Sequence, residues 1–166
     1  MKKYEHLMVL GALAASILII LTIFFPALKN DNTIIMNGLK ATFGGEIVSY
    51  GSFLSGKVNF NVLNLLAFIL PLTAAVLLYY GSVKKRKQKM FNLSLNLFAI
   101  ATFIFSVIVF ADFGLYTTGT GTLLGMTETF DYTGAKQAYG IVIALVAATT
   151  GSVLSIVHLV SKFSKR

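Results

Sequence analysis

The chain alternates between long apolar runs and shorter polar stretches, and this alternation is its strongest signal. Four runs of 19 to 23 residues contain no Asp, Glu, Lys or Arg, and they cover residues 7–25, 62–80, 91–111 and 139–161. A helix of about 19 residues is roughly 28 Å long, which is close to the ~30 Å hydrocarbon core of a bilayer. Soluble helices are amphipathic, so four helices that are apolar on every face are not expected in a small soluble protein. The pattern therefore predicts four membrane-spanning helices.

Composition strengthens this interpretation and narrows the possible chemistry. Only 12% of the residues are charged and the mean hydropathy is +0.79, whereas soluble proteins carry about 25% charged residues. The absence of cysteine excludes disulfides, thiolate metal sites and cysteine nucleophiles. No linker rich in Pro, Gly or Ser divides the chain, so residues 1–166 are expected to form one four-span domain. The preference for Lys over Arg, with abundant Phe, Ile and Asn, indicates an AT-rich bacterial genome.

The first apolar run has to be distinguished from a signal peptide, because Lys2 and Lys3 precede it. The run is longer than a usual signal-peptide core of about 7 to 15 residues, and no A-x-A cleavage site follows Pro26. We therefore expect it to be retained as a span.

The net charge of +8 is concentrated in a few places, which changes its meaning. Basic residues gather at both termini and in the connection 81–90, which carries Lys84, Lys85, Arg86, Lys87 and Lys89. An even number of spans places these segments on one face of the membrane, and the positive-inside rule identifies that face as cytoplasmic. We interpret the connection as a topological anchor that can also attract anionic lipid headgroups. The basic stretch is short and adjoins the bilayer, so nucleic acid is not an expected partner.

The first outer loop, residues 26–61, is too long for a bare helix connection. Asn37-Gly38 is a strong signal for a two-residue hairpin turn between strands at 33–36 and 39–43. After the Gly44-Gly45 break, residues 46–50 are expected to form a third strand.

The second outer loop, residues 112–138, is rich in Thr, Gly and Tyr and has a weaker pattern. The loop is expected to add one or two strands, at 115–118 and 128–132, and the glycines Gly119, Gly121 and Gly125 are interpreted as a flexible turn. Together the loops predict a small extracellular antiparallel β-cap, built mainly from the first loop and seated on the four-helix bundle.

In outline this predicted arrangement resembles the claudins, which combine a four-span bundle and cytoplasmic termini with a sheet built mainly from the first outer loop. The resemblance covers the whole chain but includes no motif. The claudin first loop carries Trp and a Cys pair, and this chain has neither residue type. The resemblance therefore implies an architecture and not the formation of cell junctions.

Polar residues within the spans lie at two depths. Asn64 and Asp112 share the outer edge of the bundle, while Asn96 and His158 share the inner edge. Such residues in lipid pair across helices or line a pathway. His6 also lies near the inner edge, so a histidine pair that binds a metal or a proton stays open if the first and fourth helices are neighbours. The favoured interpretation is that each histidine caps a helix or faces headgroups.

The middle of the bundle contains hydroxyl side chains but no carboxylate and no histidine. The hydroxyls, which the carbonyls of their own helices can satisfy, belong to Ser16, Thr73, Thr102, Thr149 and Thr150. Ion-coupled carriers place an ionisable group at this depth, so the pattern argues against that class.

A stripe of small residues follows one face of the fourth helix. It consists of Gly140, Ala144, Ala147, Gly151 and Ser155, and the first helix carries Gly11 and Ala15 in a similar pattern. Small residues let helix backbones approach closely. We expect the stripe to pack within the bundle, and the alternative is a homodimer interface.

The sequence contains no recognisable catalytic set, cofactor motif or metal-ligand spacing. The first hypothesis is a non-enzymatic integral membrane protein, an accessory subunit or cell-envelope interaction protein that binds a protein partner through its β-cap. The alternative is a small oligomeric channel or carrier for a weakly charged solute, suggested by the hydroxyls and by a kink expected at Pro71.

Overall fold

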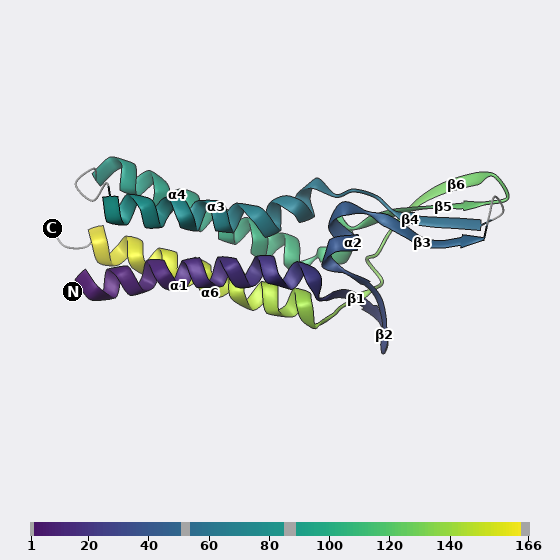
Figure 1. Cartoon of the computed structure of the whole chain (residues 1–166), viewed down its shortest axis with the longest axis horizontal. Coiled ribbons are helices and arrows are strands. Elements are labelled where there is room, and N and C mark those ends of the chain that lie inside the picture. The colour runs from purple at the N-terminus through teal and green to yellow at the C-terminus, as the bar shows by residue number, and fades with distance from the viewer. Residues whose placement is uncertain (1, 51–53, 85–88, 164–166) are drawn as a thin grey trace.

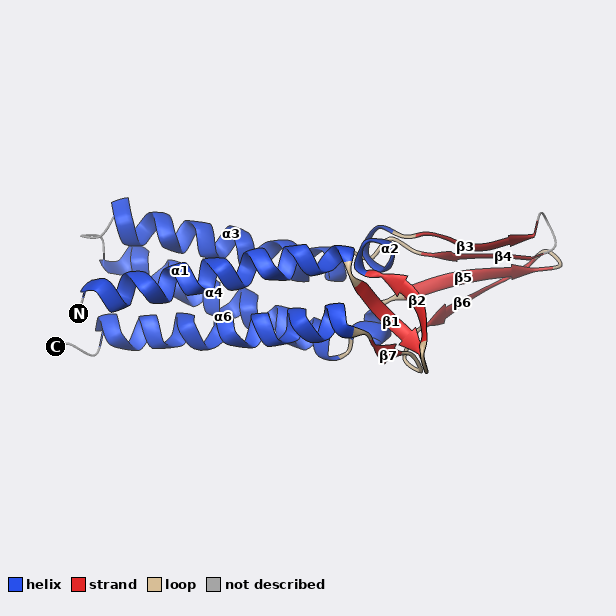
Figure 2. Ribbon diagram, turned by 60° about the horizontal axis from the view of Figure 1, so that its bottom comes forward, coloured by secondary structure: helices blue, strands red, loops and turns tan. Residues whose placement is uncertain are grey.

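The computed structural model describes residues 2–50, 54–84 and 89–163, and it combines a helical bundle with two antiparallel sheets (Figures 1 and 2). The long helices are α1 (Lys2–Leu21), α3 (Val62–Lys84), α4 (Lys89–Ala111) and α6 (Tyr139–Phe163). All four are long and apolar enough to cross a membrane. The chain is therefore a multi-pass membrane protein by the length and composition of its helices.

The bundle is apolar both inside and outside, as expected for helices in lipid. α1 packs against α3 and α6, and α4 packs against the same two helices. Phe68, Phe110 and Phe113 form a buried aromatic cluster at the end of the bundle that adjoins the sheets, here called the outer end, with the Phe68 and Phe110 ring centroids 5.0 Å apart. Outward-facing positions such as Ile104 and Val146 are also apolar and exposed. The exterior therefore suits a hydrocarbon environment.

The segment after α1 differs from the hairpin expected at Asn37-Gly38. The short 3₁₀ helix η1 (Thr22–Phe24) leads into β1 (Pro26–Asn30), which pairs with β2 (Thr33–Asn37), and helix α2 (Gly38–Phe43) follows. The Asn37 side chain accepts a hydrogen bond from the backbone N–H of Lys40 at 2.9 Å, so Asn37 is a helix N-cap and not a turn residue. The expected turn was wrong because Asn is favoured both in hairpin turns and at helix N-caps. The actual β1–β2 turn contains Asp31 at φ 47°.

Four strands from both outer loops form the larger sheet. Its order is β3 (Gly45–Tyr50), β4 (Leu54–Val58), β5 (Thr118–Leu123) and β6 (Met126–Asp131). The strands expected at 46–50 and 128–132 correspond to β3 and most of β6. The strand expected at 115–118 was wrong, since helix α5 (Phe113–Tyr116) occupies it and β5 begins at Thr118. The second loop thus contributes half of this sheet, more than the pattern predicted.

The two sheets occupy different positions relative to the bundle (Figures 1 and 2). The smaller sheet, in the order β2, β1 and β7 (Lys136–Gln137), lies against the outer ends of α1 and α6. The four-stranded sheet continues the long axis of the bundle and projects well beyond the helix ends. Its β4 and β5 strands pair along their whole length, from Leu54↔Leu123 to Val58↔Gly119.

Gln137 fastens β7 to the outer end of α4. Its side-chain amide donates hydrogen bonds to the carbonyls of Phe110, at 2.8 Å, and Ala111. These carbonyls belong to the last turn of α4, where no intrahelical donor is available. The side chain therefore caps α4 from a strand about 26 residues further along the chain.

Replacing Gln137 by alanine is expected to lower the free energy of unfolding by about 1 kcal/mol, because two helix-end carbonyls lose a donor. Hydrogen exchange should accelerate mainly in residues 108–116. The exposed Thr133→Ala is a matched control, since its hydrogen bonds go only to Asp131. Equal exchange in the two variants would contradict the capping role.

Candidate functional site

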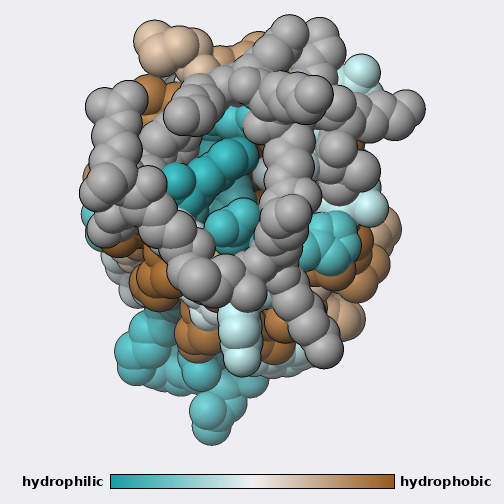
Figure 3. Space-filling view, turned by 90° about the vertical axis from the view of Figure 1, so that its left-hand side faces the viewer, coloured by the Kyte–Doolittle hydropathy of each residue, from teal (hydrophilic) through white to brown (hydrophobic). Residues whose placement is uncertain are grey.

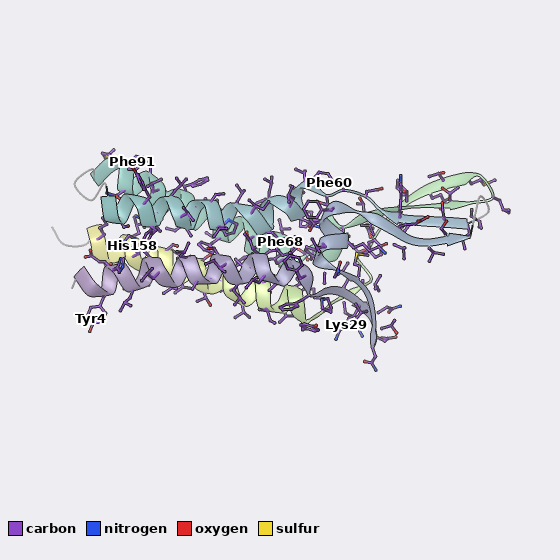
Figure 4. All side chains as sticks on the ribbon, viewed as in Figure 1. Tyr4, Lys29, Phe60, Phe68, Phe91 and His158 are labelled. Carbon is purple, nitrogen blue, oxygen red and sulfur yellow. The ribbon has the colours of Figure 1, made fainter. Side chains whose placement is uncertain are left out.

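A buried polar contact joins α4 and α6 near the end of the bundle that carries both termini. His158 Nδ1 lies 2.6 Å from Asn96 Oδ1, and both side chains are almost fully buried. The Asn96 amide nitrogen donates to the backbone carbonyl of Asn92 at 2.7 Å, which leaves Oδ1 as the acceptor. The hydrogen bond therefore assigns the ring proton of His158 to Nδ1. Figure 4 shows His158 at this end of the bundle, opposite the sheets.

The surroundings of His158 are polar but do not form a metal site. Ser152 and Ser155 lie buried on the same helix, and their hydroxyls have no hydrogen bond within the described part of the chain. Viewed from this end, Figure 3 shows hydrophilic surface between the helix ends. His6 is exposed, and its ring lies 5.9 Å from that of Tyr79, so it contacts α3. No cluster of three metal-ligating side chains occurs among the described residues.

At the outer edge, Asn64 joins segments from both loops instead of meeting Asp112. The Asn64 amide nitrogen donates to the Ala41 carbonyl of α2 and to Thr117 Oγ1, both at 3.1 Å. Asp112 is exposed and precedes α5 without a side-chain cap. The structure therefore does not bring Asn64 and Asp112 together. Asn64 ties the first and second outer loops to the start of α3.

The hydroxyls in the middle of the bundle bond to their own helices and do not surround a central path. Their acceptors are carbonyls three or four residues earlier, at 2.7 to 2.9 Å, for Ser16, Thr73, Thr102, Thr149 and Thr150. Thr73, Thr149 and Thr150 are exposed on the outside of the bundle. The interhelical hydroxyl contact comes instead from Ser106, which donates to the Ala67 carbonyl of α3 at 2.7 Å.

The stripe of small residues on α6 faces the interior. Its members Gly140, Ala144, Ala147, Gly151 and Ser155 are all buried. A Cβ on Gly151 would lie 2.2 Å from the Phe103 ring of α4, and one on Gly140 would lie 2.5 Å from the Pro26 carbonyl oxygen. This face is therefore occupied within one chain. Of the basic connection, Lys84 ends α3 and Lys89 begins α4, while Lys85, Arg86 and Lys87 lie outside the described residues.

The projecting sheet has two chemically different faces. Strand pairing places Leu54, Leu123 and Met126 in one row and Val58, Gly119 and Phe130 in another. We call the side that carries these two rows the apolar face. The opposite face carries Ser55, Lys57, Thr120, Thr122, Thr127 and Thr129. The Thr122 and Thr127 hydroxyls are 3.0 Å apart across β5 and β6 on this polar face.

Apolar side chains of the projecting sheet are exposed, because the sheet extends beyond the bundle and the helices do not cover it. Leu123 is 59% exposed, Leu124 73% and Met126 78%. Leu124 also adopts φ 51° in the β5–β6 turn, a conformation that favours Gly or Asn over leucine. The turn thus holds an apolar side chain outward at a conformational cost.

A groove lies on the apolar face beside β6. It has a volume of about 320 Å³ and is lined by Leu54, Gly121, Thr122, Leu123, Met126, Glu128 and Phe130. The Phe130 ring covers Gly119 and Gly121, since a Cβ on Gly119 would lie 2.9 Å from it.

Near the base of the strand, Thr133 donates two hydrogen bonds to Asp131 and holds the pKa of that carboxyl below its usual value.

Sequence reasoning missed this groove. It interpreted Gly119 and Gly121 as turn residues, but they lie inside β5, so the alternation of Thr and Gly was the signal for a strand with one bare face.

Comparison with known proteins finds no family model, no curated protein and no solved structure that matches this chain.

Proposed function

We propose that this chain is a non-enzymatic protein of the cell membrane that holds another protein against its projecting four-stranded sheet. The supporting observation is the apolar face of that sheet, which is exposed in water beyond the bundle. A short sheet with exposed leucine and methionine side chains is costly to maintain in solution, and exposed apolar patches of this kind mark interaction sites. An accessory subunit or a cell-envelope interaction protein is the class that this geometry supports best.

The proposal places the sheet outside the cell and both termini in the cytoplasm. Basic residues at the termini and in the connection 81–90 support this orientation through the positive-inside rule. The claudin-like outline belongs to the same proposal, and its support is the combination of four helices with a sheet at one end.

The orientation predicts a simple labelling result, since the chain lacks cysteine. Thr127→Cys, on the polar face of the sheet, should react with an impermeant thiol reagent in intact cells. Tyr4→Cys, at an exposed position of α1, should react only after the cells are permeabilised. Labelling of Tyr4→Cys in intact cells would reverse the orientation and remove the proposed extracellular role.

The partner can be sought from the same cysteine-free background. Met126→Cys, armed with a thiol-linked photo-crosslinker in native membranes, should yield a discrete adduct with another protein. Thr33→Cys is the matched control, because it is exposed on the smaller sheet. Adducts of equal yield from both positions, or none from Met126→Cys with several linker lengths, would contradict the proposal.

A small oligomeric channel or carrier stays a prediction of the sequence with less support. Thr149 and Thr150 are exposed on the outside of the bundle, so they would line a solute path only if that path ran between subunits of an oligomer.

A further inference from the structure

The groove beside β6 is bordered by three side chains of this strand on the apolar face. Strand pairing puts Met126, Glu128 and Phe130 at alternate positions of β6. Along the strand, the Glu128 carboxylate therefore stands between an apolar side chain and an aromatic one.

The groove has the chemistry of a site for a basic side chain. Glu128 has no hydrogen bond or ion pair within the described residues, and it is the only charged side chain that lines the groove. Lys and Arg carry an apolar stem and a cationic head. The stem can pack beside Met126, and the head can meet the Glu128 carboxylate beside the Phe130 ring, which also attracts cations.

A polypeptide segment fits this groove better than a free amine. β6 is an edge strand, paired only with β5 among the described residues, so its outer backbone groups can bond to an added strand. A segment added there would place every second side chain beside Met126, Glu128 and Phe130.

A second copy of this chain does not fit. Face-to-face contact would bring two Glu128 carboxylates into one apolar interface, which is unfavourable. Antiparallel pairing of two β6 edges would point the two bundles in opposite directions, because the strands run along the bundle axis (Figure 2). Two chains in one membrane cannot pair in this way.

We propose that the apolar face binds an extended segment of another protein in which a Lys or Arg is flanked at alternate positions by apolar residues. The segment pairs with β6, and its basic side chain lies beside Glu128 with its cationic head on that carboxylate. This inference rests on the proposed function and names the chemistry of the partner.

The charge is tested with the full chain in lipid nanodiscs and two fluorescent ten-residue peptides of alternating Val and Thr with one central residue, Lys or Glu. The Lys peptide should bind about tenfold more tightly than the Glu peptide, because Lys is attracted to Glu128 on the adjacent strand whereas Glu is repelled by it. Glu128→Lys should reverse the order. The control Thr129→Lys adds one positive charge on the opposite face, half of the change that Glu128→Lys makes, and should keep the order. An unchanged order in Glu128→Lys, or no binding of the Lys peptide, would overturn the inference. Competition by spermidine as strong as by the Lys peptide would show a site for small amines instead.

These results are separable from the proposed function. A Met126→Cys adduct that persists in Glu128→Lys would leave a protein-binding sheet but refute the basic segment. Loss of the adduct in Glu128→Lys, with the adduct kept in Thr129→Lys, supports the two proposals together.

Discussion

Replacing Gly151 by alanine is expected to destabilise the bundle by about 1–3 kcal/mol, the usual cost of forcing an extra methyl group into a packed core. Alanine is the better helix former by about 1 kcal/mol, so an uncrowded site would show the opposite sign. The clash decides the sign, since the new Cβ would lie 2.2 Å from the fully buried Phe103 ring.

Gly11→Ala provides the matched control for this experiment. Its new Cβ would lie 2.8 Å from a terminal methyl carbon of Leu154, which can rotate away. Thermal unfolding of purified protein in detergent should show a large decrease for Gly151→Ala and a small change for Gly11→Ala. Equal midpoints in the two variants would show that α4 and α6 are not in close contact at Gly151.

Replacing either Asn96 or His158 by leucine is expected to cost about 1–3 kcal/mol, because each change leaves a buried polar group without its partner. The double variant should cost less than the sum of the two single variants. Measured couplings of this kind within membranes reach at most about 1.7 kcal/mol. A double-mutant cycle by unfolding in mild detergent and denaturant measures the coupling.

Thr149→Val is the control for this cycle. Its hydroxyl is exposed and bonds only to the Leu145 carbonyl of its own helix, so its loss should be nearly neutral. Additive effects of the Asn96 and His158 variants would mean that their contact contributes nothing to stability.

The sequence pattern predicted a sheet in the outer loops, but two of its signals were interpreted as the wrong structures. Asn37 is favoured in both hairpin turns and helix caps, and only the Lys40 N–H shows which role it takes here. Likewise, alternating Thr and Gly at 118–121 suit either a turn or a strand. The choice depends on β4, a partner 61 to 65 residues earlier in the chain.

For the polar residues in the spans, the sequence indicated how far along its helix each one lies. It did not indicate which neighbouring helix or loop each side chain faces. Asn96 and His158 meet because α4 and α6 are neighbours, whereas Asp112 lies outside and Asn64 bonds to Thr117. The pattern contained no signal for Gln137 as a cap or for Ser106 as an interhelical donor. Both contacts join helices to segments that are distant in the sequence.

By itself, the sequence determined the four apolar helices, because the length of an uncharged run and the thickness of a bilayer are both local quantities. It also determined that polar loops separate them and where the basic residues gather. Only the tertiary structure decided which hairpins of the two outer loops join into one sheet, and that Gly56, Gly121 and Glu128 lie in a single row. Strand pairing sets that row through backbone hydrogen bonds, which are the same for every residue type and leave no mark in the sequence.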